Sequence, residues 1–176
     1  VVLIHALMKT GSVLLPVSPR LSDEERSRAL KQCRVSIDLD EPDRLTRTEA
    51  DMPLLGEHDM EDIHCRILTS GSSGAAHAVG LTYGNHLFSA MGSAYNIGVD
   101  PGDRWLCALP LSHISGLSII MRSVIYGTAV VLHDGFDVDA LARSIPEKGV
   151  TMISMVSTML LRLLDAGADL SAPRAI

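Results

Sequence analysis

Short and nearly uninterrupted apolar runs in the second half of the chain restrict the fold more than any other feature of the sequence. Three such runs, at residues 104–109, 129–132 and 151–156, are too apolar to face water. Segments with helical periodicity lie between and after them, at 116–126, from about 138 to 146, and at 159–166. Buried strands that alternate with helices are typical of a layered α/β sheet. The predicted fold class is therefore α/β, with a mostly parallel sheet and flanking helices.

The first half of the chain predicts two helices and short strands. A helical segment opens the chain and stops at Gly11. Ser22 and Glu25 form a capping-box pattern, which predicts a helix that runs to about Cys33. Short strands are expected at 13–17 and 35–39. Residues 40–62 are rich in Asp, Glu and Pro and show no clear period, so we expect a long surface connection there.

Helix caps and one apolar stripe complete the predicted elements. A strand at 65–69 leads into a loop that is expected to end at Thr82, and Thr82 or Asn85 begins the next helix. Asp137 is expected to cap one later helix, and Ser157 or Thr158 the last one. The apolar stripe of the helix after Thr82 is predicted from its spacing to comprise Leu87, Ala90, Met91, Ala94 and Tyr95.

Composition excludes several classes of protein. The 176 residues suffice for one domain, and only 3% are aromatic although 47% are hydrophobic, so the core must be aliphatic. A net charge of −6 without a Lys/Arg cluster argues against nucleic-acid binding. No apolar run reaches the roughly 18 residues of a membrane span. Three widely spaced cysteines without a Cys-x-x-Cys pair favour a reduced, cytoplasmic compartment. The sequence leaves the oligomeric state open, a homo-oligomer included.

A segment of hydroxyls and glycines, residues 69–74, is the first candidate for chemistry. Glycines let the backbone approach a ligand closely, and successive N–H groups in a tight turn form an anion site. The segment lacks the lysine of a Walker A loop and the spacing of a dinucleotide-binding loop. Its composition alone fits either a phosphate-binding loop or a flexible surface loop.

The order of residues in this region resembles a known family. Thr69-Ser-Gly-Ser-Ser-Gly74, followed by Val79 and Leu81-Thr82, is similar to the phosphate-binding loop of the acyl-adenylate-forming enzymes. Residues 83–86, 105–117 and 121–127 resemble one branch of that family, the o-succinylbenzoate–CoA ligases of menaquinone biosynthesis. The similarity extends from about residue 1 to residue 170.

The resemblance implies an architecture and a reaction. Residues 1–176 would be part of the large N-terminal AMP-binding domain, with both ends cut within it and the C-terminal domain outside the sequence. ATP and a carboxylic acid would give an acyl-adenylate and pyrophosphate, and CoA would then displace AMP. ATP, Mg²⁺ and CoA are thus the implied cofactors and substrates. No catalytic residue and no metal ligand is assigned to this chain, because the family's catalytic lysine belongs to a later region.

The resemblance also assigns two groups of site residues. Where the family loop carries a lysine, this chain has His77, which is mostly neutral at pH 7 and should hold polyphosphate more weakly. The implied phosphate-binding residues are Thr69, Ser70, Gly71, Ser72, Ser73, Gly74 and His77. The implied pocket for the acyl group is formed by His113, Ser115, Gly116, Ser118 and Arg122.

Arg122 also draws attention by its surroundings in the sequence. It lies in an otherwise apolar or small helical segment, where an unpaired cation is costly, and it shares a helix face with Ser115 and Ser118. o-Succinylbenzoate has two carboxylates, so one can be activated while the other binds a cation. Arg122 is therefore predicted either to bind that second carboxylate or to form a structural ion pair.

Two alternatives to the leading hypothesis stay open. The acid could be another aryl acid or a fatty acid, although a fatty-acid tunnel has no use for a buried cation. The chain could also be a non-catalytic relative that binds a ligand without turnover, which the sequence 75–78 (Ala-Ala-His-Ala) favours. On either view, this chain alone is expected to form no acyl-adenylate.

Overall fold

The computed structural model of the protein describes residues 1–39, 54–70 and 76–176. The chain divides into two compact units, residues 1–85 and 86–176, and the boundary falls inside one long helix. Most of the residues 40–62, predicted to be a surface connection, lie outside the described part, and 54–62 contain no helix or strand.

Two short helices and their caps in the first unit confirm the prediction from local sequence. α1 (Val2–Thr10) ends at Gly11, which takes a left-handed φ of 68°. α2 (Asp23–Gln32) begins after Ser22, whose hydroxyl accepts from the Glu25 N–H while the Glu25 carboxylate accepts from the Ser22 N–H at 2.8 Å. The reciprocal bonds satisfy two backbone donors that a helix N-terminus otherwise leaves open.

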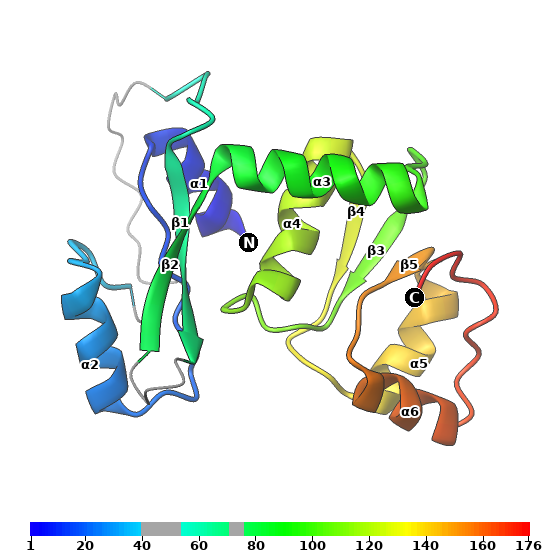
Figure 1. The fold of residues 1–176 in the computed structure, drawn as a ribbon. Helices are drawn as coiled ribbons and strands as arrows, with labels where there is room; N and C mark the ends of the chain where they lie inside the picture. The colour runs from blue at the N-terminus through cyan, green and yellow to red at the C-terminus, as the bar shows by residue number, and fades with distance from the viewer. Residues whose placement is uncertain (40–53, 71–75) are drawn as a thin grey trace. The chain divides into compact units, whose positions relative to one another are not determined.

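A β-hairpin forms the centre of the first unit (Figure 1). β1 (Ile63–Ser70) pairs antiparallel with β2 (Ala76–Thr82), and the register sets Ile67 opposite Val79 and Thr69 opposite His77. The prediction of a loop as far as Thr82 is therefore wrong for residues 76–82. Pairing with β1 gives the backbone of this Gly-containing segment its hydrogen-bond partners, a tertiary effect that the local composition hides.

The two strands predicted at 13–17 and 35–39 do not form. Leu14 makes one isolated bridge to Cys65, and Pro16 lacks the N–H that would extend the pairing. Residues 35–39 run along α2, where Asp38 forms an ion pair with Arg26 at 2.6 Å.

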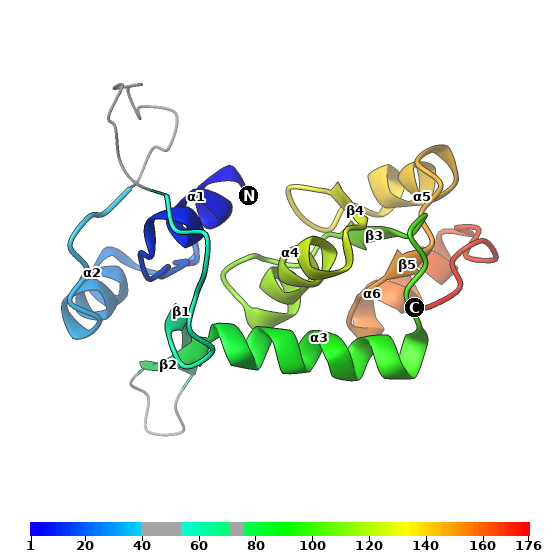
Figure 2. The same ribbon diagram turned by 90° about the horizontal axis from the view of Figure 1, so that it is seen from above.

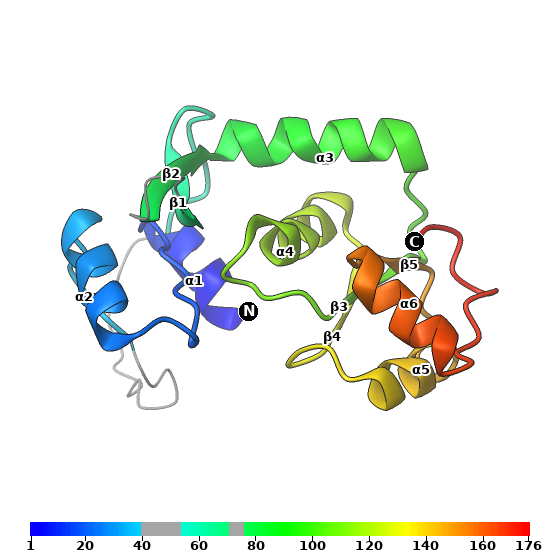
Figure 3. The ribbon, with the colours of Figure 1, turned by 60° about the horizontal axis from the view of Figure 1, so that its bottom comes forward.

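The second unit is a three-layer α/β arrangement. Its sheet has the order β4-β3-β5, and both pairs of neighbours are parallel, as predicted. The strands are β3 (Arg104–Cys107), β4 (Ala129–Leu132) and β5 (Met152–Ile153). α4 (Ile114–Tyr126) lies on one face, and α5 (Val138–Glu147) and α6 (Ser157–Asp165) lie on the other, as Figure 3 shows.

Two aliphatic clusters hold these layers together. On the α5 and α6 side, Leu106 packs in a cluster with Leu141, Ile145 and Leu163, all of which are fully buried. On the α4 side, Trp105 and Cys107 pack in a cluster with Ile119. The alternation of side chains along β3 sends Leu106 to one face and its two neighbours to the other.

Several predicted boundaries in the second unit need correction. The strands expected at 104–109 and 151–156 are confined to Arg104–Cys107 and Met152–Ile153, because only these residues have a neighbouring strand in register. Asp137 caps α5 as predicted, by accepting from the Ala140 N–H at 2.8 Å. The N-cap of α6 is Val156, without a side-chain hydrogen bond, so neither Ser157 nor Thr158 has the predicted capping role.

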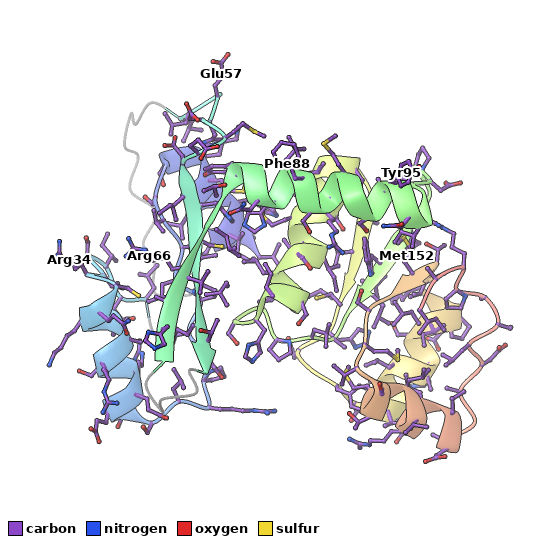
Figure 4. All side chains as sticks on the ribbon, in the orientation of Figure 1. Arg34, Glu57, Arg66, Phe88, Tyr95 and Met152 are labelled. Carbon is purple, nitrogen blue, oxygen red and sulfur yellow. The ribbon has the colours of Figure 1, made fainter. Side chains whose placement is uncertain are left out.

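The helix α3 (Tyr83–Ile97) buries only part of the predicted apolar stripe, in which Leu87 and Ala94 are half-buried. Thr82 does cap it, by accepting from the Asn85 N–H at 3.1 Å. Ala90 is buried, but Met91 and Tyr95 are 56% and 93% exposed, and Phe88 and Tyr95 point away from the helix into solvent (Figure 4). α3 crosses next to α4, seen from above in Figure 2, and the Tyr126 hydroxyl of α4 donates to the carbonyl oxygen of the buried Ala90.

Among the described residues, no helix combines the length and the apolar character that crossing a membrane requires.

Candidate substrate-binding site

The end of the β1–β2 hairpin holds the described part of the predicted phosphate-binding residues. Thr69 and His77 are a cross-strand pair, and the Thr69 hydroxyl donates to the His77 carbonyl oxygen at 3.2 Å. Directly opposite residues in a hairpin present their side chains on the same face, and both residues are exposed. Ser70 is the last residue of β1. The predicted residues Gly71, Ser72, Ser73 and Gly74 lie outside the described part of the chain.

The second group of predicted site residues lies at the start of α4, after the carboxyl end of β3. This is the edge at which ligands bind in open parallel sheets. His113 occupies the N-cap position, and its ring is exposed and makes no capping hydrogen bond. Ser115 is exposed, and its carbonyl oxygen accepts from the Ser118 hydroxyl at 3.1 Å. The side chain of His113 and the hydroxyl of Ser115 are thus open to a ligand.

Gly116 has a structural reason to be glycine. It is buried, and a Cβ atom on it would lie 2.5 Å from the Pro110 carbonyl oxygen and 2.6 Å from that of Leu109. No real Cβ contact is that short, so the first turn of α4 can approach the segment after β3 only because residue 116 has no side chain.

Arg122 lies two turns further along α4 and is half-buried. Its guanidinium carbon lies 5.6 Å from the centre of the Trp105 ring, within the range of a cation–π contact. Its Nη2 donates to the Ser89 hydroxyl at 3.1 Å, while its buried Nε has no hydrogen-bond partner among the residues that the structure describes. Within the described part of the chain, Arg122 makes no ion pair with an Asp or Glu. The predicted structural ion pair is therefore not formed among these residues.

Sequence reasoning missed two neighbours of Arg122. Trp105 is 3% exposed, and its Nε1 donates to the Ser154 hydroxyl at 3.1 Å, which fixes the plane of the ring. Ser89 lies on α3, 33 residues before Arg122 in the sequence. No local pattern marks either residue, because Trp105 meets the guanidinium through the packing of α4 on β3 and Ser89 meets it through the packing of α3 and α4.

The cysteines are not suited to nucleophilic chemistry. None of the three is in a disulfide bond, and all three are buried. Burial raises the pKa of Cys65 to about 12 and also raises the pKa of Cys107. The Cys107 thiol lies 3.8 Å from the Gly116 carbonyl oxygen, its acceptor. Since the thiolate is the reactive form, Cys65 and Cys107 are poor nucleophiles.

The described geometry therefore offers binding groups rather than a catalytic group. The Thr69 hydroxyl and the His77 imidazole lie at the end of the hairpin. In the second unit, an imidazole, hydroxyls and a guanidinium lie on or beside α4. An arginine with a fixed guanidinium and no acidic partner is suited to a carboxylate or phosphate ligand.

Known proteins share both the sequence and the fold. The chain is 38% identical over 181 residues to a 2-succinylbenzoate–CoA ligase of Bacillus pumilus, in an alignment that covers 93% of this chain and 37% of the relative. An o-succinylbenzoate coenzyme A synthetase of Bacillus subtilis in complex with AMP matches with a TM-score of 0.87 and 35% identity, over 97% of this chain and 49% of that one. The same Bacillus subtilis enzyme in complex with ATP and magnesium ion matches with a TM-score of 0.81 and 38% identity, over 92% of this chain and 38% of that one.

The chain thus spans less than half the length of these relatives. The family model described as AMP-binding enzyme matches residues 38–176, well over half of the chain. The expected α/β fold and the similarity first read from residues 69–82 and 105–127 are both confirmed by these matches. The chain belongs to the family of AMP-binding enzymes.

Proposed function

We propose that the protein containing this chain is an ATP-dependent acid–CoA ligase and that its acid is o-succinylbenzoate, which would give it a role in menaquinone biosynthesis. The carboxylate of the acid attacks the α-phosphorus of ATP, which forms an acyl-adenylate and releases pyrophosphate. The CoA thiol then displaces AMP. Family membership supports the reaction type, and the names of the relatives support the acid.

The observation that carries the choice of acid is the environment of Arg122. A guanidinium that contacts Trp105 and Ser89 but forms no ion pair within the described residues retains donors for an anionic ligand. A monocarboxylic acid spends its only carboxylate in the reaction, whereas o-succinylbenzoate retains a second one. We assign Arg122 to that second carboxylate, and His113, Ser115, Gly116 and Ser118 to the pocket around the acyl group.

We assign the nucleotide phosphates to the end of the β1–β2 hairpin. Thr69, Ser70, Gly71, Ser72, Ser73 and Gly74 would bind the phosphate oxygens through hydroxyl and N–H groups, and His77 would replace the lysine of the family. A hydrogen bond to a charged group contributes about 1.5–3 kcal/mol, so an imidazole in place of the lysine ammonium should weaken the binding of pyrophosphate. Mg²⁺ would accompany ATP, and no ligand for it is assigned to this chain.

The place of the chain within the whole protein is also a proposal. Residues 1–176 would be part of a larger N-terminal AMP-binding domain, because the matched relatives are more than twice as long. A cytoplasmic location fits three cysteines that form no disulfide bond and a need for ATP and CoA.

The test is pyrophosphate release by a protein that contains this chain together with the remaining length of its relatives. It would be assayed with ATP, Mg²⁺ and CoA and with o-succinylbenzoate, benzoate or a medium-chain fatty acid. We expect release with o-succinylbenzoate alone, and a raised KM for that acid in Arg122→Ala. Release with another acid would support the assignment as an acid–CoA ligase but change the proposed acid. No release with any acid would favour a non-catalytic chain, and His77→Lys would then test whether the missing lysine is the cause.

A further inference from the structure

The Ser89 hydroxyl is placed to act together with Arg122. It accepts a hydrogen bond from Arg122 Nη2 at 3.1 Å, and its side chain lies on an exposed part of α3. A serine hydroxyl has two acceptor lone pairs and one hydrogen to donate. Because Arg122 occupies only an acceptor position, the hydrogen of Ser89 is left to donate to a ligand.

The guanidinium beside it is held by groups that leave donors open. The Trp105 ring lies under the guanidinium and is itself fixed through Ser154. A cation–π contact uses the face of the guanidinium and not the N–H groups in its plane. Next to Ser89, the Ala90 carbonyl oxygen accepts from the Tyr126 hydroxyl, which ties α3 to α4 where the two donors meet.

We propose that Ser89 and Arg122 together bind the free carboxylate of the acid substrate. One carboxylate oxygen would accept from the Ser89 hydroxyl and the other from the guanidinium. Trp105 would be a positioning residue that fixes the direction of the guanidinium. This inference rests on the proposed function. It adds a binding residue on α3, Ser89, to a site otherwise built on α4.

The rival explanation is that the Ser89–Arg122 hydrogen bond only joins two helices. In that case, removal of the hydroxyl would lower stability and leave the preference among ligands unchanged. A direct role predicts instead that the loss of affinity appears only with ligands that carry the carboxylate in question.

The experiment is a cycle of protein variants and ligands, measured by calorimetric titration of a protein that contains this chain together with the remaining length of its relatives. The probes are o-succinylbenzoate, the analogue without its ring carboxylate and the analogue without its side-chain carboxylate. We expect Ser89→Ala to weaken the binding of o-succinylbenzoate about 10-fold, the loss of one hydrogen bond to a charged group. The analogue that lacks the bound carboxylate should bind with the same affinity to wild type, Ser89→Ala and Arg122→Ala.

Two control variants separate ligand binding from folding. Ser89→Thr retains the hydroxyl, so its affinity for o-succinylbenzoate should stay within about 3-fold of the wild-type value. This is well short of the 10-fold loss, about 1.4 kcal/mol, that is expected for Ser89→Ala. Ser93→Ala removes a hydroxyl one turn further along the same helix and should bind normally. Thermal unfolding of each variant checks that it is folded.

The outcomes distinguish this inference from the proposed function. If binding depends on Arg122 but not on Ser89, the inference is wrong and the proposed function stands. If Ser89→Ala weakens all three ligands equally, Ser89 is structural and the inference is again wrong. If wild-type protein binds none of the three acids at millimolar concentration, both proposals fail.

Discussion

The buried carboxylate of Asp103 allows a quantitative prediction of stability. Asp103 is 4% exposed and accepts four hydrogen bonds. Arg174 donates to both oxygens, at 2.9 and 2.5 Å, the Thr151 hydroxyl donates at 2.8 Å and the Asp100 N–H at 2.9 Å. Arg174 also donates to the Ile97 and Gly98 carbonyl oxygens, so the pair ties the end of α3, the start of β3 and residue 174 together.

The hydrogen bonds from Arg174, more than any other cause, lower the pKa of Asp103 from its ordinary 3.8 to about 2. At about 1.4 kcal/mol for each tenfold change in a dissociation constant, this corresponds to about 2 kcal/mol of stability. Because the pKa is lower in the folded state, the contribution is complete well above pH 4. It is lost as the pH falls through the range from about 4 to about 2, where folded Asp103 takes up its proton.

Urea unfolding of wild type and Asp103→Asn at pH 7, 5 and 3 tests this value. We expect Asp103→Asn to lower the free energy of unfolding by about 2 kcal/mol at pH 7 and 5, and by roughly half as much at pH 3. Asp134→Asn, at an exposed position, should change it by less than about 0.5 kcal/mol. A destabilisation that is the same at pH 7 and pH 3 would show that the charge of Asp103 is not its cause.

Two further predictions concern backbone geometry and are checked by thermal or urea unfolding. Arg34, labelled in Figure 4, has a left-handed φ of 52° just after α2. Glycine adopts this conformation without strain, so Arg34→Gly should stabilise the protein by about 0.5–1 kcal/mol. A loss of stability would refute the reasoning. Gly116→Ala should destabilise it by about 1–3 kcal/mol, since the added methyl meets two carbonyl oxygens; a neutral effect would mean that α4 can shift freely.

Local patterns in the sequence predicted the elements whose causes are themselves local. The capping box of Ser22 and Glu25, the left-handed Gly11 and the Asp137 cap depend on hydrogen bonds within a few residues. The bounds predicted for β4, 129–132, are those observed. Whether a short apolar segment forms a strand depends on another strand that pairs with it, and the local sequence does not show that partner. Strands were therefore predicted wrongly at 13–17 and 35–39.

The candidate site was predictable only in part. The sequence indicated Arg122 as a cation in an apolar helix and His113 at the carboxyl end of a strand, and both lie where that reasoning placed them. Their partners could not be found, because hydrogen bonds between α3 and α4 depend on how the two helices pack. The residues assigned to the phosphates stay a prediction.

The sequence by itself determined the family and the α/β class, which show in the order and pattern of residues along the chain. It also determined the caps of α1, α2, α3 and α5, because each depends on residues within about one turn. Tertiary structure alone decided that residues 76–82 pair with β1, that α3 exposes Met91 and Tyr95, and that Arg174 reaches Asp103 across 71 residues. Such contacts depend on which surfaces meet when the chain folds. They are set by packing and by the need to satisfy buried polar groups, and no local pattern encodes either.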